Sequence, residues 1–156
     1  MAPAAAYDEI ADWYEQEFLA STAAAGANPL GIDAALASLL GRGSGICLEI
    51  GCGTGARAGR VRDLGWTPCG IDLSAAMLRY ARGRLPAVRA DAVRLPVRDG
   101  CLPAVTTVMA HTDMPAYPAV VAEAARVLQP GAHSCTSAWI PAFAAGSPTA
   151  ATPPPW

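Results

Sequence analysis

Residues 47–55 read CLEIGCGTG and constrain the fold more than any other stretch of the chain. An apolar, β-prone run ends here in three glycines at alternate positions, Gly51, Gly53 and Gly55. A strand buried on both faces of a parallel sheet has this apolar character. Glycines at its carboxyl end permit a tight turn and a close approach of a ligand to the backbone. The stretch therefore predicts a strand, a turn that binds a nucleotide-like cofactor, and a helix from about Ala56.

Predicted helices and strands alternate along the rest of the chain. An amphipathic helix is expected over residues 7–25, where aromatic side chains recur at helical spacing. Further helices are expected at Ile32–Leu40, from about Ala56 to Leu64, after the N-cap residue Ser74, and from about Ala116 to Leu128; further strands are expected at Thr67–Ile71, Ala87–Ala90 and Ala104–Ala110. This alternation predicts an α/β fold, a doubly wound, mostly parallel Rossmann-like sheet with helices on both faces.

Composition narrows the class of protein. The chain has 156 residues, enough for one domain with a single core, and only 15% of them are charged, with a net charge of −2. This balance gives no sign of nucleic-acid binding. There is no apolar run long enough for a membrane span and no secretory signal, so a cytoplasmic protein is expected. The five cysteines include no C-x-x-C pair, so neither a metal site nor a disulfide framework is predicted.

Three acidic residues lie where successive strands are expected to end. Glu49 is inside the first strand, Asp72 follows the second, and Asp91 follows the third. Ligands of open α/β sheets bind at the carboxyl ends of the strands, where an acid about twenty residues beyond the glycine turn binds ribose hydroxyls. An acid after the third strand is placed to accept from an adenine amine. The alternative is that these carboxylates cap helices or are solvated loop charges.

A second interpretation of the glycine turn is a dinucleotide site. Gly51-x-Gly53-x-x-Ala56 satisfies G-x-G-x-x-A, the pattern of NAD(P)-dependent oxidoreductases. Glu49 argues against that interpretation, because a carboxylate beside the turn repels a pyrophosphate and tolerates a cation. Sulfonium and amino groups are such cations.

Four motifs, read in order, resemble the class I S-adenosylmethionine-dependent methyltransferases, and most closely the small-molecule type 11 family. They are CLEIGCGTG, GIDLSAAML (Gly70–Leu78), RADAVRLPVRDG (Arg89–Gly100) and RVLQPG (Arg126–Gly131). The segment YDEIADWY resembles the amino-terminal lid helix of that family. The resemblance implies S-adenosyl-L-methionine as cofactor, bound by Tyr7, Tyr14, Glu49, Gly51, Cys52, Gly53, Gly55, Asp72, Leu73, Met77, Asp91, Ala92 and Ala110.

The implied reaction is in-line methyl transfer to a nucleophilic atom of a small molecule, with no nucleic-acid or membrane partner. Proximity and alignment supply much of the acceleration of such a displacement, so no universal catalytic residue is required. His111, directly after the fourth strand, is the candidate general base. Its alternative role is to line the pocket or cap a helix. A catalytically impaired remnant that only binds cofactor is a third hypothesis for the chain.

The carboxyl-terminal segment departs from the family. No charged residue follows Arg126, prolines recur, and no fifth strand is recognisable after Gly131. The expected organisation is a cofactor-binding domain over residues 1–131, with lid helices in 1–44, and an atypical tail over 132–156 that lacks the last strands of the full fold. We hypothesise a truncation or a frameshift near codon 131, with a divergent terminus as the alternative; resequencing the gene distinguishes them.

Overall fold

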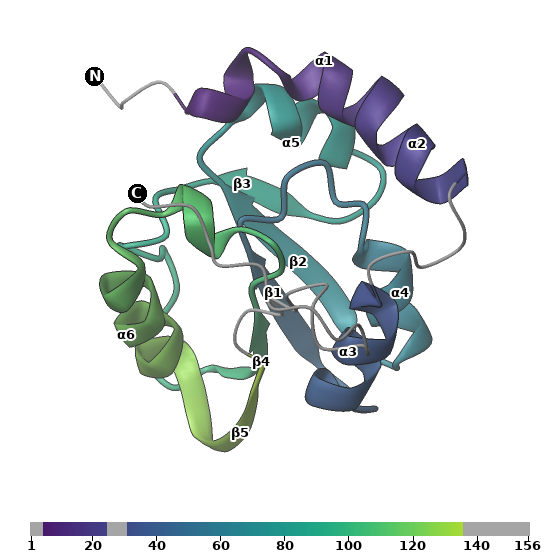
Figure 1. The fold of residues 1–156 in the computed structure, drawn as a ribbon. Helices are drawn as coiled ribbons and strands as arrows, with labels where there is room; N and C mark the ends of the chain where they lie inside the picture. Colours follow the sequence, from purple (N-terminus) through teal and green to yellow (C-terminus); the bar gives the residue numbers. More distant parts are fainter. Residues whose placement is uncertain (1–4, 25–30, 136–156) are drawn as a thin grey trace, which may run out of the picture.

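The computed structural model describes residues 5–24 and 31–135 of the chain. Its strands are β1 (Ile46–Ile50), β2 (Thr67–Asp72), β3 (Ala87–Arg89), β4 (Leu102–Thr106) and β5 (Leu128–Cys135). They pair in parallel in the order β3-β2-β1-β4-β5 (Figure 1). The order reverses between β1 and β4, which is where a doubly wound sheet binds its ligand. The predicted fold class is confirmed.

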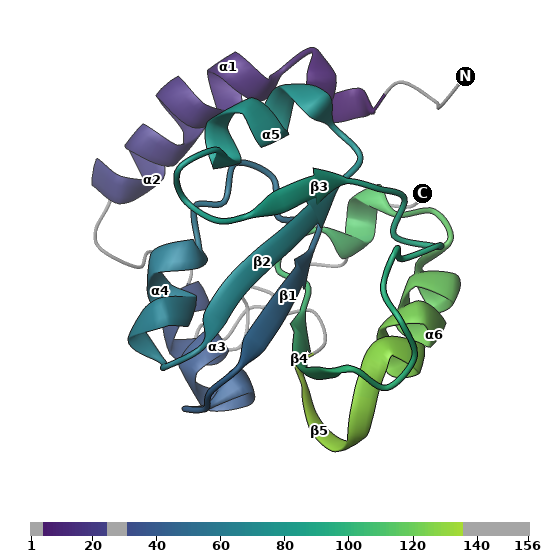
Figure 2. The same cartoon turned by 180° about the vertical axis from the view of Figure 1, so that it is seen from behind.

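Helices cover both faces of the sheet. Helices α3 (Ile32–Leu40) and α4 (Ala58–Asp63) pack on one face, and α6 (Tyr117–Val127) packs on the other (Figure 2). The first core contains Leu36, Leu40, Cys47, Val61 and Trp66; the second contains Ile50, Ile71, Val105, Val120 and Val127. Alternate residues of β1 supply the two cores, as the period of a strand requires. Each helix in the described part of the chain is too short or too polar to cross a membrane.

The amino-terminal segment forms a nearly continuous helical rod beside α5 (Ala75–Ala81) (Figure 1). It comprises η1 (Ala6–Asp8), α1 (Ala11–Trp13), a π-helical turn η2 (Tyr14–Phe18) and α2 (Leu19–Ala24), and we call residues 6–24 the lid. Acidic side chains at positions 8, 12 and 15 hold the lid on α5 and the loop after it. Asp12 Oδ1 accepts from Tyr80 Oη at 2.7 Å, and Glu15 Oε2 accepts from Arg84 Nη1 at 2.9 Å.

The loop between β3 and β4 is fixed to α6 by a charged cluster. Arg126 donates to Glu123 and Asp99 and to the carbonyl oxygens of Leu95 and Val97. Glu123 in turn accepts from the Leu95 N–H at 2.7 Å. These hydrogen bonds hold the pKa of Glu123 at about 2, well below its usual range.

Strands β4 and β5 differ from the sequence-based expectation. β4 begins at Leu102 and ends at Thr106, before the predicted end at Ala110. A fifth strand, which the sequence analysis did not recognise, pairs with β4, and the register shifts between Leu102 and Ala104. Pro103 has no N–H to donate at that shift. β5 tolerates Pro130 because β5 is an edge strand of the described sheet, and the backbone groups on its outer side have no neighbouring strand there to bond. Residues 136–156, and with them most of the predicted tail, lie outside the described residues.

Candidate functional site

The glycine turn after β1 is fixed to the end of β2 by hydrogen bonds. Gly51 N–H donates to Ile71 O at 2.9 Å, and Gly53 N–H donates to Asp72 Oδ2 at 2.8 Å. Gly51 has a φ of +71°, and a Cβ there would lie 2.8 Å from the Cβ of Ala110. Both the left-handed backbone and the close approach of the opposite wall therefore require glycine at this position.

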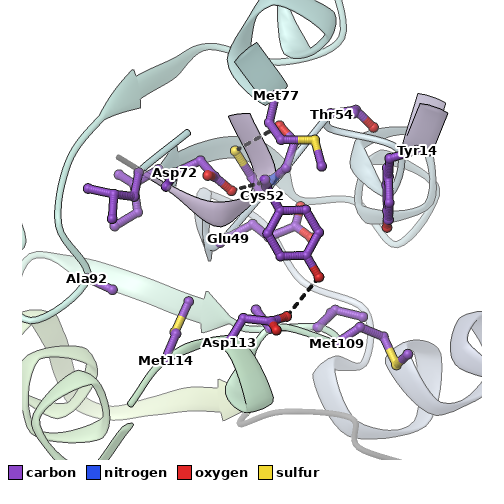
Figure 3. Close-up of a pocket in the computed structure, with 18 of the residues that line it drawn as sticks. Tyr14, Glu49, Cys52, Thr54, Asp72, Met77, Ala92, Met109, Asp113 and Met114 are labelled. Atoms are coloured by element: carbon purple, nitrogen blue, oxygen red, sulfur yellow. Dashed lines mark hydrogen bonds between the residues drawn. The ribbon is translucent and has the colours of Figure 1, made fainter. Parts of the chain in front are cut away.

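A cavity of about 800 Å³ opens between this turn, the lid and the segment that follows β4 (Figure 3). Every predicted cofactor-binding residue except Gly55 lines it: Tyr7, Tyr14, Glu49, Gly51, Cys52, Gly53, Asp72, Leu73, Met77, Asp91, Ala92 and Ala110. Gly55 packs instead against Leu85, whose side chain a Cβ would meet. Burial raises the pKa of the Cys52 thiol, so this side chain stays neutral while its N–H donates to Ile71 O.

Glu49 is the buried carboxyl group of the cavity. It pairs in register with Gly70 of β2 and Thr106 of β4, is 4% exposed, and its Oε2 has no hydrogen-bond partner among the described residues. Burial raises its pKa to about 8, the Asp72 carboxylate adds to the rise, and the Arg57 guanidinium opposes it. A buried carboxyl with an unused acceptor is costly unless a ligand completes its hydrogen bonding.

Asp72 and Asp91 line the cavity and also stabilise their own loops. Asp72 Oδ1 accepts from Ser74 N–H at 2.8 Å, while its Oδ2 accepts from Gly53 N–H. Burial raises the pKa of Asp72, against the effect of these hydrogen bonds. Asp91 Oδ1 accepts from Val93 N–H at 3.1 Å. These loop hydrogen bonds leave a second lone pair on each carboxylate oxygen that accepts one.

The lid lines the cavity and contacts the segment after β4. Tyr7 Oη donates to Asp113 Oδ2 at 2.9 Å, a contact between residues 106 positions apart. Burial and that hydrogen bond raise the pKa of Tyr7 to about 12. The Tyr7 ring meets Tyr14 edge-on at 6.1 Å, and Tyr14 stacks on Phe18 at 5.1 Å. The predicted aromatic stripe therefore forms one wall of the cavity.

A family profile described as a methyltransferase domain matches residues 48–136, more than half of the chain. The chain belongs to the methyltransferase domain family. The match spans the glycine turn, Asp72 and Asp91, so the resemblance carried by the sequence motifs is confirmed. No curated protein matches the sequence.

Solved structures share the fold of this methyltransferase domain. A chain from a Haloferax volcanii complex of the Trm112 methyltransferase activator with a candidate methyltransferase has a TM-score of 0.70 and 21% identity, over 83% of this chain and 58% of that one. A candidate histamine N-methyltransferase from Thermotoga maritima has a TM-score of 0.62 and 26% identity, over 79% and 55%. A TehB-like methyltransferase from Corynebacterium glutamicum has a TM-score of 0.65 and 21% identity, over 81% and 71%. The methyltransferase domain thus spans little more than half the length of the first two.

The family assigns S-adenosyl-L-methionine as the cofactor, and the residues of the methyltransferase domain fit it. Glu49 Oε2, which has no hydrogen-bond partner among the described residues, suits an ammonium group, and the turn leaves its backbone open at Gly53, where a Cβ would meet nothing within 4 Å. Asp72 and Asp91 follow at the ends of the next two strands. Among the residues that the structure describes, no group of three or more acidic, histidine or cysteine side chains is placed to hold a metal ion.

Three residues of the cavity or the lid were not predicted from the sequence, and one predicted residue, His111, is not tested by the structure. Asp113 lines the cavity and binds Tyr7; Arg57 lines it and pairs with Asp33 at 3.4 Å; Asp8 lies just outside it. Asp8 Oδ1 accepts from Ser74 Oγ and Ala76 N–H, which anchors the lid to the start of α5. For Asp8, the helical spacing of the acidic residues at positions 8, 12 and 15 was the signal that could have predicted its role. His111 begins η3 (His111–Asp113), but its side chain is outside the described part, so its role stays a prediction.

Proposed function

We propose that this chain transfers the methyl group of S-adenosyl-L-methionine to a small-molecule acceptor. The cofactor supplies a methyl carbon on a sulfonium, whose leaving group is a neutral thioether. The observation that carries the proposal is the buried Glu49 carboxyl in the cavity wall beside the glycine turn, whose Oε2 has no hydrogen-bond partner among the described residues.

Different parts of the cofactor would contact residues at the carboxyl ends of different strands. Glu49 would accept from its ammonium group, because a charge-assisted hydrogen bond satisfies the orphaned oxygen. Asp72 would accept from the ribose hydroxyls through the lone pairs that Gly53 and Ser74 leave unused. Asp91 would lie on the adenine side, while Tyr14 on the lid would cover the cofactor from above. Together these contacts would fix the direction from which the acceptor approaches.

A small acceptor is favoured over a polymer by the shape and charge of the cavity. The Tyr7–Asp113 hydrogen bond joins the lid to the segment after β4, two parts of the chain that line the cavity, and would bound the space beside the cofactor. The carboxyl groups of Asp72, Asp91 and Asp113 line the cavity and would repel the phosphates of a nucleic acid.

Calorimetric titration of the full chain tests the proposed function. We expect S-adenosylmethionine and S-adenosylhomocysteine to bind and NADH to give no saturable heat. Asp72→Ala should weaken binding of S-adenosylhomocysteine at least about ten-fold, the loss of one charge-assisted contact. Asp63→Ala, on an exposed side chain at the end of α4, is the matched control and should bind as wild type. Tight NADH binding without a response to S-adenosylmethionine would identify an oxidoreductase instead.

A further inference from the structure

The cavity has a second wall that the cofactor contacts leave unassigned. Met109, Asp113 and Met114, all from the segment after β4, lie together on one side of the cavity, away from Thr54 and Met77 (Figure 3). Tyr7 of the lid reaches this side of the cavity through its hydrogen bond to Asp113. In the proposed arrangement this side of the cavity would be the space beside the cofactor, where the acceptor would bind.

The charge of the lining is strongly one-sided. Four carboxyl side chains line the cavity, those of Glu49, Asp72, Asp91 and Asp113. Arg57 is the only cationic side chain among the described lining residues, and it is already paired with an aspartate on α3. Glu49, Asp72 and Asp91 are taken up by the proposed cofactor contacts. Asp113 is the carboxylate that remains for the acceptor.

Asp113 combines with the lid aromatics in a pattern suited to a cation. Its Oδ2 accepts from Tyr7 Oη, and the remaining lone pairs of the carboxylate can accept hydrogen bonds from further donors. The Tyr7 and Tyr14 rings are edge to face, and Tyr14 stacks on Phe18. Aromatic faces attract ammonium groups, and a carboxylate within reach adds a charge-assisted hydrogen bond.

We propose that the acceptor is an amine that enters as its ammonium form and is bound by Asp113 and the ring of Tyr7. This inference rests on the proposed function. The bound ammonium gives one proton to solvent, and the freed lone pair forms the N–C bond to the methyl carbon. The C–S bond breaks with its electron pair on sulfur, and the product leaves as an N-methylammonium that Asp113 still matches in charge.

Three isosteric probes test the proposal on the full chain saturated with S-adenosylhomocysteine: 2-phenylethylamine, 2-phenylethanol and phenylacetate. We expect the amine to bind at least about ten-fold more tightly than the alcohol, and phenylacetate to bind most weakly. Asp113→Asn keeps an oxygen for Tyr7 Oη but removes the charge, so it should reduce the amine preference below about three-fold. The Kd of S-adenosylhomocysteine should stay within about two-fold of wild type, and Asp63→Asn should leave both values unchanged.

The outcomes separate the two proposals. Equal binding of the probes, binding of none, preference for phenylacetate, or an amine preference that survives Asp113→Asn overturns the amine proposal alone, provided that S-adenosylhomocysteine binds. The last of these results would reduce Asp113 to a latch for the lid. Failure of wild-type protein to bind S-adenosylhomocysteine overturns the proposed function and the amine proposal with it.

Discussion

Cofactor binding should expel a proton from Glu49. In the ligand-free protein, burial raises the pKa of this carboxyl to about 8, against an ordinary value of 4.5, so it is protonated at neutral pH. An ammonium group at Oε2 would favour the ionised form and return the pKa toward its ordinary value. If it returns below 6, the affinity for S-adenosylmethionine rises roughly twenty-fold between pH 6 and pH 7.5. Above that interval the amino group of the ligand itself loses its proton.

The stability of the ligand-free protein should show the opposite dependence. A carboxyl whose pKa is raised in the folded state contributes stability below pH 4.5, and this contribution is lost as the pH rises to about 8. Each pH unit in that window removes at most about 1.4 kcal/mol. The melting temperatures of wild type and Glu49→Gln should therefore be compared at pH 5 and pH 8. From pH 5 to pH 8 the melting temperature of wild type should fall relative to that of the variant, until the two are equal or the variant is the more stable.

Calorimetry at pH 6.5 in two buffers of different ionisation enthalpy measures the proton directly. Wild type should release about one proton for each S-adenosylmethionine bound, and Glu49→Gln should release none. Asp63→Asn, on the exposed end of α4, is the control and should behave as wild type. No proton release by wild type, or a Kd that increases from pH 6 to pH 7.5, would contradict the predicted ionisation of Glu49 on cofactor binding.

Three further predictions concern the turn, the lid and the adenine-side loop. Gly51→Ala should weaken S-adenosylhomocysteine binding more than ten-fold, measured by calorimetry, and should lower the free energy of unfolding by about 1–3 kcal/mol, measured by chemical denaturation. Gly59→Ala is the control, because a Cβ there meets nothing within 4 Å. Equal effects of the two substitutions would contradict a special requirement for glycine at position 51. Asp8→Ala should expose the lid to limited proteolysis and weaken cofactor binding; hydrogen bonding lowers the pKa of Asp8, so acid should mimic the variant only below pH 3.8. Glu123→Gln should speed hydrogen exchange in residues 92–100, and wild type should follow as the pH falls from 4.5 toward 2; unchanged exchange rates would exclude Glu123 as their anchor.

Local sequence signals located most of the fold because their causes are local. The apolar run before Gly51 predicted β1, α3 has its predicted bounds, and Ser74 caps α5 by accepting from Met77 N–H at 3.1 Å. β5 escaped prediction because its residues include Pro130 and have little strand propensity. The open side of β4 supplies the partners that form it.

For the site, the order of residues along the chain shows which strand ends carry acids and which turn is rich in glycine. The order of Glu49, Asp72 and Asp91 along the chain is enough for that, because parallel strands end at one edge. The burial of Glu49, with no partner for Oε2 among the described residues, depends on tertiary packing, since β2 and β4 pair with β1 on either side of it. The Tyr7–Asp113 contact joins residues 106 positions apart. No local sequence pattern encodes a contact over that separation; the packing of the lid against α5 brings Tyr7 to Asp113.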